Sequence, residues 1–329
     1  MAKKPYRYAV LEAIANEMRA NPDMCYFYEY QSPVAVGPTG EILNLAREFG
    51  PWRTSGDRGG WALDEAWYVG CATGVAMTGV PVVCELPSMT TTMPLEFVYN
   101  QTANMSMMTG GQVSVPVVMW MDGAGRGGGS AQQHSQVGQE ALYANIPGLK
   151  IVIPSNAYDA AGLMTAAIRD PDPVQFWAYS EVQAGEQPDV PDEPYEVPIG
   201  PAVVRQEGTD LTLVSFAPAT VDVGKALPDI EAEGISVEYI DPRTLKPLDV
   251  DTIAKSVEKT GKMLVVEHGY WTNGFSANIV AEVAQVVDGA ILRRITFPDA
   301  AGPASGDMIA WMRPDAPKIL EAVKKMAAM

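Results

Sequence analysis

The sequence predicts an α/β protein built from two doubly wound domains. Short β-branched runs alternate with helical stretches along the chain, which is typical of parallel sheets that carry helices on both faces. The alternation is interrupted once, by an aperiodic segment rich in proline and acidic residues at 181–198. We therefore expect one domain in residues 1–180, a linker over 181–198, and a second domain in residues 199–329.

In the first domain, the periodicity of apolar residues predicts both helices and buried strands. The chain begins with an amphipathic helix, because Val10, Ile14 and Met18 recur at helical spacing. Short β-branched runs predict buried strands at 80–86, 113–121, 150–155 and 173–179. Helical stretches flank these strands at 63–79, 94–111, 135–148 and 157–170. Several of them end in glycine, the residue that most often closes a helix.

After the linker the same alternation resumes. Apolar runs predict strands at 210–217, 235–241, 262–268 and 290–298. Helical patterns lie between and after them, at 220–234, 249–261, 274–287 and 316–329. A second parallel sheet covered by helices is the expected result.

The overall composition excludes some functions. A chain of 329 residues with 47% hydrophobic residues can bury a real core. A formal charge of -17 argues against partners with a phosphate backbone and against anionic membrane surfaces, since both would be repelled. Solubility is the simplest explanation of that charge.

The cysteines and the amino-terminal residues indicate a compartment. Cys25, Cys71 and Cys84 lie in apolar stretches without metal-ligand spacing, so we expect buried free thiols in a reducing compartment. The sequence displays no signal peptide and no apolar run long enough to cross a bilayer. We expect a cytoplasmic protein.

One glycine-rich stretch, "DGAGRGGGSAQQHSQ" at 122–136, ends near one of only two histidines in the chain, His134. Its glycines at 123, 125 and 128 satisfy G-x-G-x-x-G, yet polar residues delay the next helix and no ribose-binding acid follows, which disfavours a dinucleotide site. A P-loop is excluded because no Lys-Ser/Thr follows. The remaining alternatives are a surface loop, or a loop whose backbone approaches a ligand while His134 moves protons.

Two more ionisable residues stand out. Glu65 begins an almost wholly apolar helix, so it is either an acid favoured by the helix dipole, a role that Asp64 fits equally, or a buried glutamate held for acid–base work. His268 ends a strand of the second domain, where ligands gather in parallel sheets. A structural histidine is the more common outcome at such a position.

Several separated motifs, taken together, resemble one family. They are "TGGQVSVPVVMWMDGAGRGGGSAQQHSQ", "PGLKIVIPSNAYDAAGLMTAAIRDPDPV" and "EYIDPRTLKPLDVDTIAKSVEKTGKMLVVEHG", in this order along the chain. The sequence is similar to the beta subunits of the thiamine-diphosphate-dependent 2-oxo acid dehydrogenases, which include the pyruvate, branched-chain and acetoin enzymes. The resemblance covers nearly the whole chain. It implies a transketolase-type pyrimidine-binding domain followed by a transketolase carboxyl-terminal domain.

The resemblance also implies partners. In the family an alpha subunit holds the diphosphate and Mg²⁺ through a G-D-G…N motif, which this sequence lacks. The expected unit is a heterotetramer of two alpha and two beta chains, and the acyl group passes to a lipoyl transacylase. The alternative is a carboligase or transketolase-like half-enzyme that acts without a lipoyl partner.

Residue roles follow from the aligned motifs. Glu65 matches the family's acid, which hydrogen-bonds the aminopyrimidine nitrogen and so favours the imino tautomer that deprotonates the thiazolium carbon. Glu29, in "YFYEYQ", matches a second acid near the cofactor. His134 matches a loop histidine that handles protons during decarboxylation and acyl transfer.

The sequence departs from the family pattern near the expected cofactor. The aromatic residue that usually stacks on the pyrimidine aligns with Thr90 or Thr91, and Trp67 replaces a small residue. Family members also hold a structural potassium ion near the segment that corresponds to Ala167, Asp170 and Asp172. The resemblance thus implies thiamine diphosphate, Mg²⁺ held mainly by the alpha subunit, and K⁺.

Overall fold

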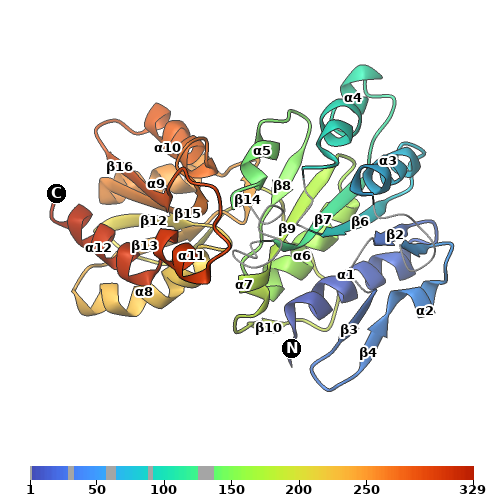
Figure 1. Cartoon of the computed structure of the whole chain (residues 1–329), viewed down its shortest axis with the longest axis horizontal. Coiled ribbons are helices and arrows are strands. Elements are labelled where there is room, and N and C mark those ends of the chain that lie inside the picture. The colour runs from blue at the N-terminus through green and yellow to red at the C-terminus, as the bar shows by residue number, and fades with distance from the viewer. Residues whose placement is uncertain (1, 29–32, 57–63, 88–91, 125–136) are drawn as a thin grey trace. The chain divides into compact units, whose positions relative to one another are not determined.

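The computed structural model describes residues 2–28, 33–56, 64–87, 92–124 and 137–329 (Figure 1). The chain forms two compact units. The first comprises Met1–Ala124 and Tyr143–Ile199, and the second comprises Gly200–Met329 with the described part of Gly125–Leu142. Each unit is an α/β fold, as the alternating sequence pattern predicts.

The first unit is built on a parallel sheet. Its strands run in the spatial order β8 (Lys150–Val152), β9 (Val174–Tyr179), β7 (Val117–Ala124), β6 (Val82–Pro87), β2 (Cys25–Tyr28) and β5 (Thr54–Gly56). Every neighbouring pair in this order is parallel. The residues of β9 are buried throughout, which explains why its sequence is apolar except at Gln175 rather than alternating.

Helices cover both faces of this sheet (Figure 1). On one face α1 (Tyr6–Ala20) packs against α6 (Ala157–Arg169). On the other, α3 (Glu65–Ala76) packs on β6 and β7. Val10, Ile14 and Met18 of α1 are fully buried, so the predicted helical spacing marks a core face.

The helix predicted at 94–111 is broken in the structure. It consists of a π-helical segment η3 (Phe97–Thr102) and a short helix α4 (Met105–Met108). The Thr102 hydroxyl donates to the Phe97 carbonyl, and the Asn104 amide donates to the Tyr99 carbonyl. These side chains compete with the regular helical hydrogen bonds, which accounts for the break.

Several short elements of the first unit carry no periodic signal. A hairpin pairs β3 (Val34–Val36) with β4 (Ile42–Asn44), and β1 (Ala2–Lys3) pairs with β10 (Asp189–Val190) inside the predicted linker. The remaining short helices are α2 (Leu45–Phe49), α5 (Glu140–Ala144) and α7 (Ser180–Gln183).

The second unit has its own sheet, in the order β11 (Val203–Gln206), β13 (Val237–Asp241), β12 (Leu211–Ser215), β15 (Lys262–Tyr270) and β16 (Ile291–Phe297). Edge strand β11 is antiparallel to β13, and the other pairs are parallel. The helices are α8 (Thr220–Ala232), α9 (Val250–Thr260), α10 (Phe275–Val286), α11 (Gly306–Met312) and α12 (Ala316–Ala327), and β14 spans Thr244–Lys246.

Two expectations from the sequence concern the state of the cysteines and the presence of membrane-spanning helices. All three cysteines are free; Cys84 is buried, whereas Cys25 and Cys71 are half-buried. Among the described residues, none of the helices combines the length and the apolar character needed to span a membrane.

Candidate active site at the carboxyl edge of the first sheet

The strand order of the first unit reverses between β2 and β6. From β2 the chain crosses to β5 on one side, and it then returns to place β6 on the other side of β2. In open parallel sheets, ligands bind outside the carboxyl ends of the strands at such a reversal. The ends that meet at this edge are Tyr28 of β2, Pro87 of β6 and, on the next strand, Ala124 of β7.

Glu65 lies at this same edge. It is the first residue of α3, the helix that follows β5 and leads into β6, so the amino end of α3 is at the carboxyl edge of the sheet. Asp64 caps the helix, because its carboxylate accepts a hydrogen bond from the Trp67 backbone N–H at 3.0 Å. Capping is therefore done by the exposed Asp64, and Glu65 is left for another role.

The carboxylate of Glu65 is buried without a partner from the described chain. The residue is 6% exposed, and among the described residues no side chain or backbone group forms a hydrogen bond or ion pair with it. A buried carboxylate needs donors to offset the loss of water. A donor to this carboxylate therefore has to come from outside the described residues.

The other predicted cofactor residues lie outside the described residues. Glu29 directly follows β2, Thr90 and Thr91 follow β6 at three and four residues, and His134 follows β7 at ten residues. Each thus belongs to a segment that leaves the sheet at the carboxyl edge where Glu65 lies. Their positions remain predictions.

A cluster that sequence reasoning missed lies under the same edge. The Arg7 guanidinium of α1 contacts Glu85 of β6 and Asp122 of β7, with Nη1 2.6 Å from Glu85 Oε1 and 2.7 Å from Asp122 Oδ2. Both carboxylates are buried. The available signal was an acid near the end of two otherwise apolar strand sequences, "VVCEL" and "VVMWMD".

The predicted potassium residues gather around a lysine ammonium. Lys150 Nζ lies 2.7 Å from Asp170 Oδ1 and 3.1 Å from Asp172 Oδ2. Ala167 is the third predicted residue, and its carbonyl accepts the Asp170 backbone N–H at 3.3 Å. The lysine ammonium contacts both carboxylates and offsets one of their two charges, so they fit a bare cation poorly. More generally, no group of three or more His, Cys, Asp or Glu in the described part of the chain could hold a metal ion.

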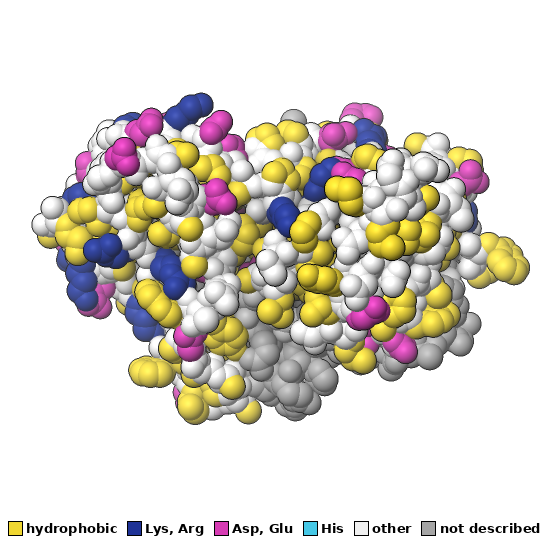
Figure 2. Space-filling view, turned by 90° about the horizontal axis from the view of Figure 1, so that it is seen from above, with side chains coloured by type: hydrophobic (Ala, Val, Ile, Leu, Met, Phe, Trp, Pro, Cys, Tyr) yellow, Lys and Arg dark blue, Asp and Glu magenta, His cyan; other side chains and the backbone are white. Residues whose placement is uncertain are grey.

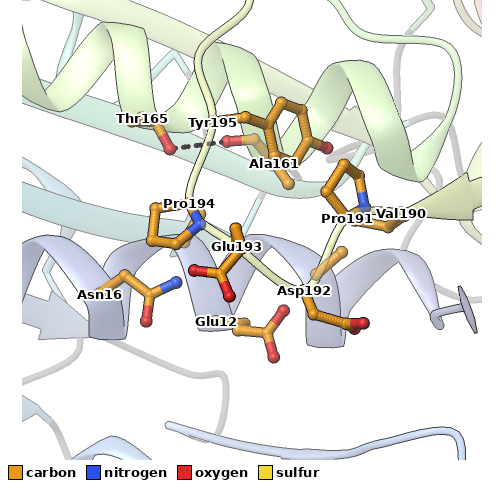
Figure 3. Close-up of a pocket in the computed structure, with 12 residues that line it drawn as sticks. Glu12, Asn16, Ala161, Thr165, Val190, Pro191, Asp192, Glu193, Pro194 and Tyr195 are labelled. Atoms are coloured by element: carbon orange, nitrogen blue, oxygen red, sulfur yellow. Dashed lines mark hydrogen bonds between the residues drawn. The ribbon is translucent and has the colours of Figure 1, made fainter. Parts of the chain in front are cut away.

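Figure 3 shows a small cavity between α1, α6 and the segment 190–195. Glu12, Asp192 and Glu193 line it, and the ammonium of Lys4 pairs with Glu12 at 2.7 Å and Asp192 at 3.3 Å. Its volume of about 20 Å³ holds a single water molecule. It is too small for a cofactor, and Glu65 does not line it.

For His268 the sequence left open a ligand-binding role or a structural role. The residue is buried near the end of β15. Its Nε2 lies 3.2 Å from Asp222 Oδ2, and its ring meets Phe297 edge-on with centroids 5.7 Å apart. The Arg313 side chain binds the same Asp222 oxygen, with Nη2 at 2.6 Å. This packing is that of a structural histidine.

The fold and the position of Glu65 define a class, and the family comparisons agree with it. The model for the transketolase pyrimidine-binding domain matches residues 2–179, and the model for the transketolase C-terminal domain matches residues 200–319. The chain is therefore a two-domain protein of the transketolase type. A solved structure titled "Split gene transketolase, inactive beta4 tetramer" shares this fold, with a TM-score of 0.79, 20% identity and 98% coverage of both chains.

Full-length relatives narrow the class. The chain is 34% identical to the pyruvate dehydrogenase E1 component subunit beta of Bacillus subtilis, over 99% of both chains. It is 36% identical to the subunit of the same name in Rhizobium meliloti, covering 98% of this chain and 70% of the relative. A Cupriavidus necator protein named acetoin:2,6-dichlorophenolindophenol oxidoreductase subunit beta is 34% identical, over 99% of this chain and 98% of the relative. The chain belongs to this family of dehydrogenase beta subunits, which confirms the resemblance read from its motifs.

Proposed function

We propose that this chain is the beta subunit of a thiamine-diphosphate-dependent dehydrogenase that acts on a 2-oxo acid or an acetoin-type substrate. The names of the full-length relatives support this function. The single structural observation that carries it is Glu65, a carboxylate buried at the reversal point of the sheet with no partner among the described residues. The chain supplies one wall of the cofactor site.

Glu65 fits the aminopyrimidine half of thiamine diphosphate. A ring nitrogen that carries a proton would give the buried carboxylate the donor that the described chain does not provide. When bound, the cofactor supplies a thiazolium carbon that adds to the carbonyl of the substrate. Glu65 holds a proton at the ring nitrogen, and its burial excludes water that would weaken this hydrogen bond.

The remaining roles rest on the alignment of motifs. His134 moves protons to and from the substrate, and Glu29 is a second acid beside the cofactor. Thr90 and Thr91 replace the aromatic residue that would stack on the pyrimidine, so we expect a weaker stacking contribution, by about 1 kcal/mol.

The alpha partner binds on the α3 side of the first unit. Four exposed apolar side chains lie there, Trp67 of α3, Tyr99 of η3, and Met107 and Met108 of α4, the last two 85% and 70% exposed. Figure 2 looks onto the side where α3 and α4 lie in Figure 1, and apolar side chains are spread over it. Trp67 is two residues from Glu65, so a chain seated here reaches the cofactor site.

Assembly, metals and compartment complete the proposal. The alpha chain holds the diphosphate and Mg²⁺, two alpha and two beta chains form the heterotetramer, and a lipoyl transacylase accepts the acyl group. The reduced thiols fit the cytoplasm. Because the Lys150 ammonium already pairs with Asp170 and Asp172, a potassium ion near Ala167 would depend mainly on backbone carbonyls. A thermal midpoint that is equal in KCl and NaCl would argue against that ion.

Co-expression with the alpha-type gene tests the function. The purified complex is assayed with thiamine diphosphate and Mg²⁺ against a panel of 2-oxo acids and acyloins, and we expect turnover that depends on the cofactor. The chain alone should bind the cofactor poorly and turn nothing over. Robust turnover by the lone chain, or none by the complex on any substrate, contradicts the proposal.

The partner surface has its own test. Met107→Glu combined with Met108→Glu places two charges on exposed positions, so the fold should be retained while association with the alpha chain weakens at least tenfold. Val286→Glu is the matched control, because Val286 is also exposed but lies in the second unit. Equal binding of both variants to the alpha chain would rule out this surface.

A further inference from the structure

The cluster around Arg7 links three elements of the first unit. Nη1 of Arg7, from α1, lies between a carboxylate oxygen of Glu85 on β6 and one of Asp122 on β7, at 2.6 and 2.7 Å. The guanidinium also lies over the Trp120 ring of β7, 5.0 Å from its centroid. One cation thus holds two neighbouring strands and a helix together.

Every oxygen of the two carboxylates has a donor. The second oxygen of Glu85 accepts the Tyr26 hydroxyl of β2, and the second oxygen of Asp122 accepts the Gln183 amide of α7 at 2.7 Å. Glu85 has no exposed surface and Asp122 is 5% exposed. A buried network in which each acceptor is satisfied fixes its members in one arrangement.

The network lies at one level of the sheet, close to where three strands end. Glu85 pairs in register with Tyr28, the last residue of β2, and Asp122 pairs with Pro87, the last residue of β6. The residues that follow these strands are the segments 29–32, 88–91 and 125–136, to which the sequence assigns Glu29, Thr90, Thr91 and His134. No residue of the network is among those assigned to the cofactor.

We propose that Arg7, Glu85 and Asp122 are positioning residues, which fix the carboxyl ends of β2, β6 and β7 and thereby the points where the three cofactor segments leave the sheet. This inference rests on the proposed function, because the segments matter only if they hold thiamine diphosphate. The network acts through the backbone and touches neither cofactor nor substrate.

The charge of the network changes near neutral pH. Burial raises the pKa of Glu85 to about 7, Arg7 opposes this shift and Asp122 adds to it. The groups that face Glu85 are Arg7 of α1, Tyr26 of β2 and Asp122 of β7. Burial raises the pKa of the Tyr6 hydroxyl of α1, and the charge of Asp122 adds to this shift. Ionised Glu85 forms a full ion pair with Arg7, whereas protonated Glu85 offers only a hydrogen bond, so the Arg7–Glu85 contact strengthens as pH rises through 7, even though ionising this buried carboxylate lowers the overall stability.

Two near-isosteric variants separate the charge from the geometry. In Glu85→Gln the amide still accepts from Arg7 and donates to the Tyr26 hydroxyl oxygen, so the contacts remain and the charge is lost. We expect kcat of the wild-type complex to rise through pH 7, by about tenfold, and kcat of this variant to stay at the low-pH value. In Asp122→Asn one of the two donors loses its acceptor, so we expect kcat to fall by about 10- to 100-fold at every pH.

A matched control removes a similar ion pair away from the site. Asp241 of β13 is fully buried and pairs with Arg205 at 2.8 Å in the second unit. Asp241→Asn should lower stability as Asp122→Asn does, yet leave kcat and its pH profile unchanged. If Asp241→Asn and Asp122→Asn changed kcat equally, the network would contribute only to the stability of the fold, and the inference would be overturned.

Hydrogen–deuterium exchange of the full chain gives a second readout that does not need turnover. We expect Asp122→Asn to raise exchange in peptides that cover 88–91 and 125–136, and Asp241→Asn to leave those peptides unchanged. Unchanged exchange in Asp122→Asn overturns the positioning role whether or not the complex is active. Absence of cofactor-dependent turnover in the wild-type complex, with raised exchange in Asp122→Asn, instead defeats the proposed function and retains the positioning role.

Discussion

The two units place buried carboxylates at comparable edges of their sheets but treat them differently. In the second unit, Glu267 near the end of β15 accepts the backbone N–H groups of Phe275 and Ser276 at 2.8 and 2.9 Å. In the first unit, Glu65 finds no such donor among the described residues. At the second edge the carboxylate receives donors from its own chain, whereas at the first none of the described residues donates to Glu65. The difference teaches that burial alone does not distinguish the two carboxylates; the origin of their hydrogen-bond donors does.

The largest expected effect comes from exchanging each carboxylate for its amide. Glu65→Gln should lower turnover of the assembled complex by about 10²- to 10⁴-fold, because a neutral amide cannot hold the proton at the pyrimidine nitrogen. Its thermal midpoint should stay close to that of the wild type. Turnover and unfolding are measured on the same preparation.

Glu267→Gln is the counterpart in the second unit. The amide group cannot accept both backbone N–H groups at the start of α10, so stability should fall by about 1–3 kcal/mol. Turnover per folded complex should be retained. If Glu65→Gln lost only stability and Glu267→Gln lost only turnover, the comparison between the two edges would be reversed.

An effect on stability similar to that of Glu267→Gln is expected from adding a side-chain atom at the edge of the second sheet. A Cβ on Gly274 would lie 2.4 Å from the Tyr270 carbonyl oxygen and 2.6 Å from Glu267 Oε2. Gly274→Ala should therefore destabilise the protein by about 3 kcal/mol, as overpacking does at its upper range. Gly224→Ala is the control, since a Cβ there meets nothing within 4 Å and a helix interior favours alanine. The free energies of urea unfolding of both variants show whether the packing around Gly274 is too tight for a side chain.

The smallest effect is a pair of pH dependences with opposite sign. Because burial raises the pKa of Glu85 to about 7, the folded state holds this proton longer than the unfolded chain does, and stability falls by roughly 1–2 kcal/mol from pH 5.5 to 7.5. Burial lowers the pKa of His268, against the opposing effect of Asp222, so this residue costs stability as pH falls below the ordinary value of 6.5.

Two neutral variants isolate these dependences. Relative to wild type, Glu85→Gln should gain stability as pH rises through 7, and His268→Asn should gain stability as pH falls below 6.5. Denaturant midpoints at pH 5.5 and 7.5 measure both. Differences that do not change with pH would mean that neither group titrates differently on folding.

Much of the fold could be predicted because its signals are local. The largely apolar sequence of β9 and the spacing of Val10, Ile14 and Met18 on α1 are each recognised within a single strand or helix, and the structure has both elements. The helix at 94–111 failed because Thr102 and Asn104 compete for backbone carbonyls, which a hydrophobic pattern does not register. Edge strands such as β1 and β10 are too short to leave a pattern.

The residues of the candidate site also differ in whether local sequence could identify them. Glu65 could be proposed as a site residue because it begins a largely apolar helix within a motif of the family. The Arg7 network could not, because its ion pairs join residues 78 and 115 positions apart in the sequence. Nor could the contact of Lys150 with Asp170 and Asp172, which depends on the pairing of β8 with β9.

The sequence by itself determined the α/β class, the family and the identity of the acid at the start of α3, because each is encoded in contiguous residues. Only the tertiary structure decided which polar groups are satisfied. In the structure Asp64 caps α3, and two backbone N–H groups donate to Glu267. No group among the described residues donates to the carboxylate of Glu65. The physical reason is that a buried charge is balanced by groups that strand order brings close, and strand order is a property of the assembled sheet rather than of any segment.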